Sequence, residues 1–233
     1  MRLDTLKVLN AERAARRATI LVTDVVSGEQ RLVKGADIAT DHLAEHLDAA
    51  LRMGKSRSIE DNGRNYFLTV QAPPARIICI GAVHISQALA PMARLADFDV
   101  TIIDPRTAFA TPERFPDVRL LADWPQDVLG TVGLDRYTAV CLLTHDPKID
   151  DPALIAALKA ECFYIGALGS RKTHAKRLER MMAEGFDEAS LGRIHAPIGL
   201  DIGSVSPAEI AVSVLGEIIM SLRKKPLRKE TGA

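Results

Sequence analysis

The segment Arg76-Ile-Ile-Cys-Ile80, followed at once by Gly81-Ala-Val-His-Ile-Ser86, decides the fold of this sequence. A short run of apolar residues without polar alternation is typical of a parallel β-strand that is buried on both faces. A glycine directly after such a strand, with a helical pattern behind it, is typical of a tight β-α turn. The segment therefore predicts an α/β fold built on a parallel sheet.

Strands and helices keep alternating after this segment. We predict further strands at residues 98–104, 118–121, 138–143 and 162–165, and helices at 86–96, 151–160, 172–184 and 207–222. Repeated β-α-β units form parallel sheets with right-handed crossovers and with helices on both faces. We therefore expect a Rossmann-like, doubly wound parallel sheet in a domain spanning residues 75–233.

The first 74 residues follow a different pattern, which predicts a small N-terminal α+β domain. We expect a strand at 19–26, a return strand at 31–34, a helix at 37–53 ended by Gly54, and a hairpin that turns at 61–63. Pro73 and Pro74 can continue neither a helix nor a central strand, so they mark a linker.

Composition excludes several classes of function. Lys plus Arg and Asp plus Glu number 30 each, so a net charge of zero gives no reason to expect nucleic acid or an anionic membrane as partner. No apolar run approaches the roughly 18–20 residues of a membrane-spanning helix. Residues 1–17 lack the apolar core of a signal peptide, and we expect a cytoplasmic protein.

The three cysteines, Cys79, Cys141 and Cys162, are widely spaced and form neither a CxxC pair nor a zinc-binding spacing. Each lies in or beside an apolar run. The sequence therefore predicts buried free thiols rather than disulfides or a metal site.

The turn after the first strand is a modified dinucleotide-binding fingerprint. Of the three glycines in GxGxxG only Gly81 is present, and Val83 and Ser86 occupy the other two positions. The branched side chain of Val83 would crowd a pyrophosphate, which disfavours NAD(P). Asp104 nevertheless ends the next strand roughly 20 residues on, where a ribose-binding carboxylate belongs. The turn is interpreted either as a site for a phosphorylated ligand or as a turn kept only for folding.

A second candidate site is the segment from Gly166 to His174. Gly166 and Gly169 allow backbone conformations that expose N–H groups, and Ser170 supplies a hydroxyl. Arg171 offers a planar guanidinium that suits phosphate or carboxylate. These groups lie at the start of a predicted helix, so the segment predicts an anion site. The alternative is a helix cap with solvated basic residues.

Two further loops contain candidate residues. One follows a predicted strand, and the other precedes the last predicted helix. His145 and Asp146 suit acid–base chemistry or a capped loop. His195 and Asp201 lie in a loop rich in glycine and proline, where a ligand role and a structural role remain open. This loop ends at Ser206, which we expect to form a capping box with the last helix.

Together these segments resemble the XdhC/CoxI family. The resemblance rests on residues 104–106, 109–115, 143–147, 164–174, 194–203 and 206–211, and it covers about residues 76–220. It implies an accessory protein of xanthine dehydrogenase that binds the molybdenum cofactor, assists its sulfuration and hands it to a molybdenum hydroxylase. It also implies a Rossmann-like C-terminal half.

The candidate loops and the resemblance together predict a set of cofactor-binding residues and no catalytic or metal-binding residue. The set is Gly81, His84, Asp104, Arg106, His145, Gly166, Gly169, Ser170, Arg171, His174, His195 and Asp201. A molybdenum hydroxylase such as xanthine dehydrogenase is the expected partner, and a cysteine desulfurase is a further candidate. A homodimer would cover strand edges of the N-terminal hairpins.

The sequence departs from the family pattern in two places. Gly81 and His84 match the family's glycine-rich GxGHxG-like turn, whereas Val83 and Ser86 do not. The first 74 residues contain no cysteine, where the family's long form has a Gly-Gly-Cys segment, so the chain resembles a short form. An NAD(P)-dependent oxidoreductase and a ligand-free interaction scaffold stay open as alternatives.

Overall fold

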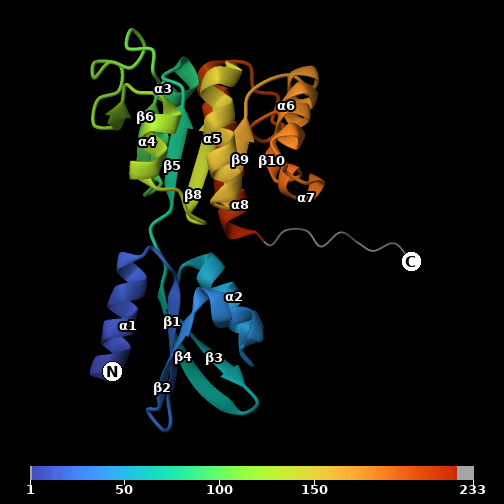
Figure 1. Ribbon diagram of the computed structural model, residues 1–233. Helices are drawn as coiled ribbons and strands as arrows, with labels where there is room; N and C mark the ends of the chain where they lie inside the picture. The colour runs from blue at the N-terminus through green and yellow to red at the C-terminus, as the bar shows by residue number, and fades with distance from the viewer. Residues whose placement is uncertain (1, 225–233) are drawn as a thin grey trace. The chain divides into compact units, whose positions relative to one another are not determined.

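A computed structural model of the protein describes residues 2–224, and the chain divides into two compact units between Pro73 and Pro74 (Figure 1). The N-terminal unit contains α1 (Leu3–Ala14), β1 (Thr19–Asp24), β2 (Gln30–Lys34), a 3-10 helix (Gly35–Thr40), α2 (Ala44–Met53), β3 (Arg57–Asp61) and β4 (Arg64–Gln71). Its four strands form an antiparallel sheet in the order β2-β1-β4-β3. The small α+β architecture predicted from the sequence is confirmed.

Two features of the N-terminal unit differ from the prediction. The helix predicted at 37–53 is interrupted, because the Asp41 carboxylate accepts a hydrogen bond from the Leu43 backbone N–H (2.9 Å) and pairs with Arg31 (2.9 Å). The chain is extended at Asp41, and α2 begins only at Ala44. Helix α1 was not predicted, since it has little apolar periodicity and Glu12 is its only buried residue.

The C-terminal unit contains a six-stranded parallel sheet in the order β10-β9-β8-β5-β6-β7. The strands are β5 (Arg76–Ile80), β6 (Asp99–Ile103), β7 (Arg119–Leu121), β8 (Thr138–Leu142), β9 (Tyr164–Ala167) and β10 (Ile194–His195). The helices are α3 (His84–Leu95), α4 (Pro125–Val132), α5 (Pro147–Lys159), α6 (Arg171–Ala183), α7 (Glu188–Leu191) and α8 (Pro207–Arg223). This strand order is that of a Rossmann-like, doubly wound fold, as predicted.

Helices cover both faces of this sheet, because alternate residues of the central strand point to opposite sides. Ile77 and Cys79 of β5 belong to the core that includes residues of α3 and α8, whereas Ile78 and Ile80 belong to the core that includes residues of α4, α5 and α6. All four side chains are fully buried. Burial on both faces of the sheet explains why β5 is an uninterrupted apolar run.

Several boundaries differ from the prediction for local reasons. Helix α5 begins at Pro147, because the Asp146 side chain accepts a hydrogen bond from the Lys148 N–H (2.9 Å) and caps the helix. Strand β9 begins at Tyr164, because Cys162 instead donates its N–H to Ala157 and closes the end of α5. Helices α4 and α7 and the two-residue strand β10 were not predicted.

The predicted state of the cysteines is confirmed, since all three are buried and free. None of the helices within residues 2–224 combines the length and the apolar character that crossing a bilayer requires.

Candidate functional site

The carboxyl ends of β5 and β8 lie side by side, at the point where the chain direction across the sheet reverses. Gly81 follows β5 with φ at +120°, and a Cβ there would lie 2.9 Å from the Thr144 side chain. Only glycine therefore allows the two loops to approach this closely. Open α/β sheets bind ligands at this kind of position.

Asp104, the carboxylate expected to bind a ribose, is fully buried and already occupied. Its Oδ2 accepts hydrogen bonds from the Ala82 N–H (2.7 Å) and from Arg106 (2.7 Å), and its Oδ1 accepts two more from Arg106, both 2.9 Å. Burial would raise the pKa of Asp104, but the hydrogen bonds from Arg106 and Ala82 outweigh it and the pKa lies below its usual value. This arrangement leaves neither oxygen for a ribose hydroxyl.

Ser86, at the position of the third fingerprint glycine, also serves the turn itself. Its buried hydroxyl donates to the Gly81 carbonyl (2.7 Å) and accepts from the Val83 N–H (2.9 Å). His84 begins α3 and is exposed. The turn is thus held by internal hydrogen bonds with Ser86 and by the Ala82 N–H, which donates to Asp104.

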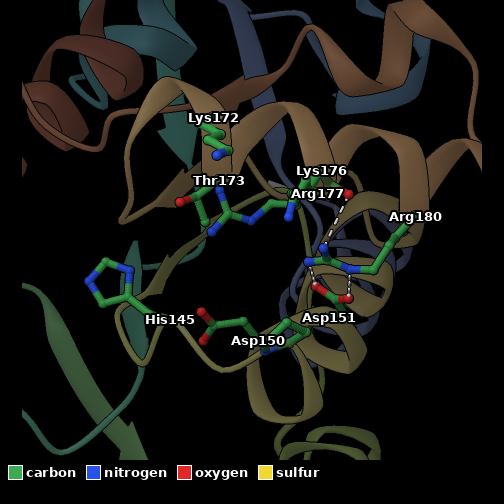
Figure 2. A pocket seen from close by; sticks show the side chains of 9 residues that line it. His145, Asp150, Asp151, Lys172, Thr173, Lys176, Arg177 and Arg180 are labelled. Atoms are coloured by element: carbon green, nitrogen blue, oxygen red, sulfur yellow. Dashed lines mark hydrogen bonds and ion pairs between the residues drawn. The ribbon is translucent and has the colours of Figure 1, made fainter.

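A pocket of about 260 Å³ lies between α5 and α6, beside the carboxyl ends of β8 and β9 (Figure 2). It is lined by His145, Pro147, Asp150, Asp151, Lys172, Thr173, Lys176, Arg177 and Arg180. The loops that follow β8 and β9 meet here, since a Cβ on Gly169 would lie 3.8 Å from His145 Nδ1. We call this space the α5–α6 pocket.

Two buried ionisable side chains face the α5–α6 pocket with unpaired atoms. Arg177 is 2% exposed and donates from Nη2 to the Leu168 carbonyl (2.9 Å), while its Nε and Nη1 have no hydrogen-bond partner among residues 2–224. Asp150 is also 2% exposed. Its Oδ1 accepts from the Thr144 hydroxyl (2.7 Å), and Oδ2 has no partner within the described part of the chain.

Burial affects the ionisation of both groups. It raises the pKa of Asp150 to about 6. It lowers the pKa of Arg177, although a guanidinium stays charged in proteins.

Neither Asp150 nor Arg177 was predicted as a site residue from the sequence. The only signal was a charged residue at helical spacing from buried apolar ones, Arg177 four positions before Met181.

The charge of the pocket is net positive. Arg180 forms a bidentate pair with Asp151, at 2.5 and 2.9 Å, and the two charges cancel. Lys172, Lys176 and Arg177 then face the single carboxylate of Asp150.

The predicted anion-binding segment is placed partly in this pocket. Gly169 has φ at +134°, and Ser170 caps α6 by accepting a hydrogen bond from the Thr173 N–H (3.2 Å). Arg171 is exposed and, among the described residues, is not part of the pocket lining. His174 is half-buried, and burial together with the charge of Arg177 lowers its pKa.

His195 belongs to a different cluster on the opposite face of the sheet, which we call the β10–α8 cluster. The Glu217 carboxylate of α8 binds His195 Nδ1 (2.9 Å) and accepts hydrogen bonds from the Tyr164 hydroxyl (2.7 Å) and the Gly199 N–H (2.8 Å). Burial would raise the pKa of Glu217, but the hydrogen bonds from His195 and Tyr164 keep it below its usual value.

Gly166 packs under this cluster. A Cβ on Gly166 would lie 2.5 Å from the Tyr164 hydroxyl and 2.6 Å from Ile198, so the glycine makes room for them. Asp201 lies exposed in the loop before α8. The predicted capping box is confirmed, since Ser206 and Glu209 exchange hydrogen bonds with each other's backbone.

Known proteins with similar sequences and folds agree with this architecture. A model of the family "XdhC Rossmann domain" matches residues 77–218. A protein of Bacillus subtilis, described as a probable subunit of xanthine dehydrogenase, is 30% identical over 165 residues, which are 70% of this chain and 48% of the relative. The molybdenum cofactor insertion chaperone PaoD of Escherichia coli is 32% identical over 146 residues, 63% of this chain and 40% of the relative.

The chain thus spans less than half the length of these relatives. A crystal structure of a xanthine dehydrogenase from Bacillus halodurans has a similar fold, with a TM-score of 0.65 at 23% identity, covering 94% of this chain and 67% of that one. Sequence, fold and family match agree, and the chain belongs to the XdhC family through its Rossmann domain.

Proposed function

We propose that the protein binds the molybdenum cofactor and assists its sulfuration and insertion into a xanthine dehydrogenase-type molybdoenzyme. The observation that carries the proposal is the net positive α5–α6 pocket at the ligand-binding edge of the sheet. The names of the two relatives, a probable xanthine dehydrogenase subunit in one case and a molybdenum cofactor insertion chaperone in the other, support it.

The residues of this edge fit the cofactor better than a nicotinamide dinucleotide. Molybdopterin carries a phosphate, and Arg177 holds two unpaired nitrogen atoms beside Lys172 and Lys176. The two positions that a dinucleotide would use are unsuitable, because Val83 replaces a glycine and Asp104 is fully hydrogen-bonded. A chaperone needs binding groups at this edge and no residue that turns a substrate over.

The proposal also assigns roles to the predicted residues that lie outside the pocket. We propose that Gly81, His84, Arg106 and Arg171 line the path of the cofactor along the sheet edge, whereas Gly166, His174, His195 and Asp201 shape the surrounding loops. We further propose a molybdenum hydroxylase as client, a cysteine desulfurase as sulfur source, a cytoplasmic location and a homodimer.

The test is a binding titration of the whole purified protein with molybdenum cofactor, run beside NAD(H) and NADP(H). We expect saturable binding of the molybdenum cofactor alone, followed by activation of a cofactor-free molybdenum hydroxylase on mixing. Binding of a nicotinamide nucleotide without the molybdenum cofactor would replace the proposal by an oxidoreductase. Binding of neither would replace it by a ligand-free scaffold.

A further inference from the structure

We propose that the α5–α6 pocket binds a phosphomonoester group, with Arg177 as its main anchor and with Lys172 and Lys176 as additional cationic contacts. The inference rests on the proposed function only in naming the source of the phosphate, the terminal group of the bound cofactor. The site itself follows from the geometry of the pocket.

Arg177 lacks partners for most of its hydrogen-bonding groups. This side chain is almost fully buried, yet two of its three guanidinium nitrogen atoms have no partner among the described residues. Buried polar groups are nearly always hydrogen-bonded, and a buried charge without a partner is especially costly. A guanidinium presents N–H groups that match two oxygens of a phosphate. An oxyanion in the pocket would therefore satisfy Arg177.

The charges around the pocket favour an anion over a cation. With Arg180 and Asp151 paired to each other, three cationic side chains face one carboxylate. Lys172 and Thr173 of the pocket lining belong to the first turn of α6, where the helix dipole favours negative charge. The three cationic side chains and the helix end both favour a negatively charged ligand.

Asp150 opposes anion binding while it is ionised. Figure 2 shows its carboxylate on the side of the pocket opposite Lys172, Thr173 and Arg177, and Oδ2 has no partner among the described residues. When Asp150 is protonated, its carboxyl O–H can donate a hydrogen bond to a phosphate oxygen. An amide at this position should therefore bind the anion more tightly than the carboxylate does.

The size of the pocket limits what it can enclose. At about 260 Å³ the pocket lies below the range of about 300–1,000 Å³ that encloses whole small-molecule ligands. It has ample room for a phosphate group and is smaller than the pockets that enclose whole ligands. The rest of the ligand would then extend from the pocket along the carboxyl edge of the sheet.

The experiment is a calorimetric titration of the full chain with inorganic phosphate. We expect Arg177→Met to weaken the affinity between about ten- and a hundredfold, the effect of losing a charge-assisted hydrogen bond. Asp150→Asn should tighten it at pH 7.5. Arg119→Met, at an exposed position on β7, is the matched control and should bind as the unmodified protein does.

Variants of exposed residues keep the test valid if Arg177→Met fails to fold. Lys172→Ala and Lys176→Ala remove charges from the pocket lining, and each should weaken phosphate binding about threefold or more. The proposal is overturned if the unmodified protein shows no saturable phosphate binding. It is also overturned if the Arg177 and lysine variants bind phosphate as tightly as the control does.

A second arm separates this inference from the proposed function. If molybdenum cofactor and phosphate compete, and both lose affinity in Arg177→Met, the cofactor phosphate occupies the pocket. Equal cofactor affinity in Arg177→Met and the control would overturn the assignment of the cofactor phosphate to this pocket and leave the proposed function intact. Arg177-dependent binding of free phosphate, without any cofactor binding, would overturn the proposed function and leave the pocket as a phosphate site.

Discussion

Two polar clusters flank the same parallel sheet, and they differ in how completely their polar groups are paired. In the β10–α8 cluster, Glu217 takes hydrogen bonds from Tyr164, His195 and Gly199. In the α5–α6 pocket, Arg177 and Asp150 keep unpaired atoms among the described residues, although both are almost fully buried. A fully paired buried network makes a fold rigid, whereas an incompletely paired one requires a water molecule or ligand to complete it.

His195 and His145 both lie in candidate loops of the sequence, but they have different environments in the structure. His195 is held by Glu217 and packs against Tyr164 with ring centroids 4.8 Å apart, so it ties β10 to α8. His145 is exposed, with φ at +61°, and lines the α5–α6 pocket. The first cluster is expected to control stability, and the second to control binding.

The largest effect should come from Glu217→Ala. This change leaves the Tyr164 hydroxyl and the Gly199 N–H without their buried acceptor, so the free energy of unfolding should fall by about 3–5 kcal/mol. Denaturant unfolding followed by circular dichroism measures this loss. Glu179→Ala, an exposed glutamate on α6, is the control and should change stability by no more than about 0.5 kcal/mol. A loss below about 1 kcal/mol for Glu217→Ala would contradict the structural role of the cluster.

The second effect is on the pH dependence of stability and concerns Asp150. Its folded-state pKa of about 6 lies above the ordinary value of 3.8, so its contribution is fully present below pH 4 and is lost as the pH rises through 6. The total loss is about 3 kcal/mol, from about 1.4 kcal/mol per pKa unit. Asp150→Asn should remove this loss, so that its stability relative to the unmodified protein rises between pH 4 and pH 8.

Unfolding curves at a series of pH values across this range check the prediction. Asp123→Asn, at an exposed position, provides the baseline for removing a carboxylate that is not buried. If the curves of the two variants stay parallel, Asp150 does not titrate near pH 6.

A smaller effect is expected for Arg171→Ala. Arg171 is exposed at the first position of α6 and, within residues 2–224, does not line the pocket. Its charge should add at most about 1 kcal/mol to phosphate binding, a loss of less than about sixfold in affinity. The phosphate titration of this variant, compared with Arg177→Met, ranks the two arginines. A larger loss for Arg171 than for Arg177 would make Arg171, which the sequence places in the predicted anion site, the main anchor.

The smallest expected effect concerns thiol labelling, which should be very slow in the native protein. All three cysteines are buried, and burial raises the pKa of Cys162 to about 12, so the reactive thiolate is scarce. A disulfide reagent should label the unmodified protein and Asp150→Asn only as fast as they unfold. Glu217→Ala should label faster because it unfolds more readily. Rapid labelling of the unmodified protein would show that the core opens without global unfolding.

The segments that predicted the fold correctly are those in which local chemistry is sufficient. The apolar run of β5 needs burial on both faces wherever it lies, and Ser206 with Glu209 caps α8 through bonds within one helical turn. Predictions failed where a distant partner decides the local structure. Asp41 ends the helical run before α2 because Arg31, on a strand, holds its carboxylate.

The sequence predicted which loops lie at the edge of the sheet, but not which polar groups there are already paired. The β-α rhythm sends the loops after β8 and β9 to one sheet edge, so His145 and Gly169 were expected there and lie close together. Asp104 also lies at the predicted strand end, but Arg106 and Ala82 occupy it. Spacing in a sequence shows that a carboxylate can reach a ligand, but it does not show which groups nearby already bind that carboxylate.

The sequence by itself determined the Rossmann-like sheet, the buried cysteines and the family, because these depend on local apolar patterns, turn residues and extended motifs. Only the tertiary structure decided which buried polar groups are paired. Glu217 meets Tyr164, 53 residues away, whereas Arg177 and Asp150 face a pocket with atoms that no described residue pairs. The reason is physical: hydrogen-bond pairing depends on how helices pack across the sheet, and this packing places residues together that no local pattern connects.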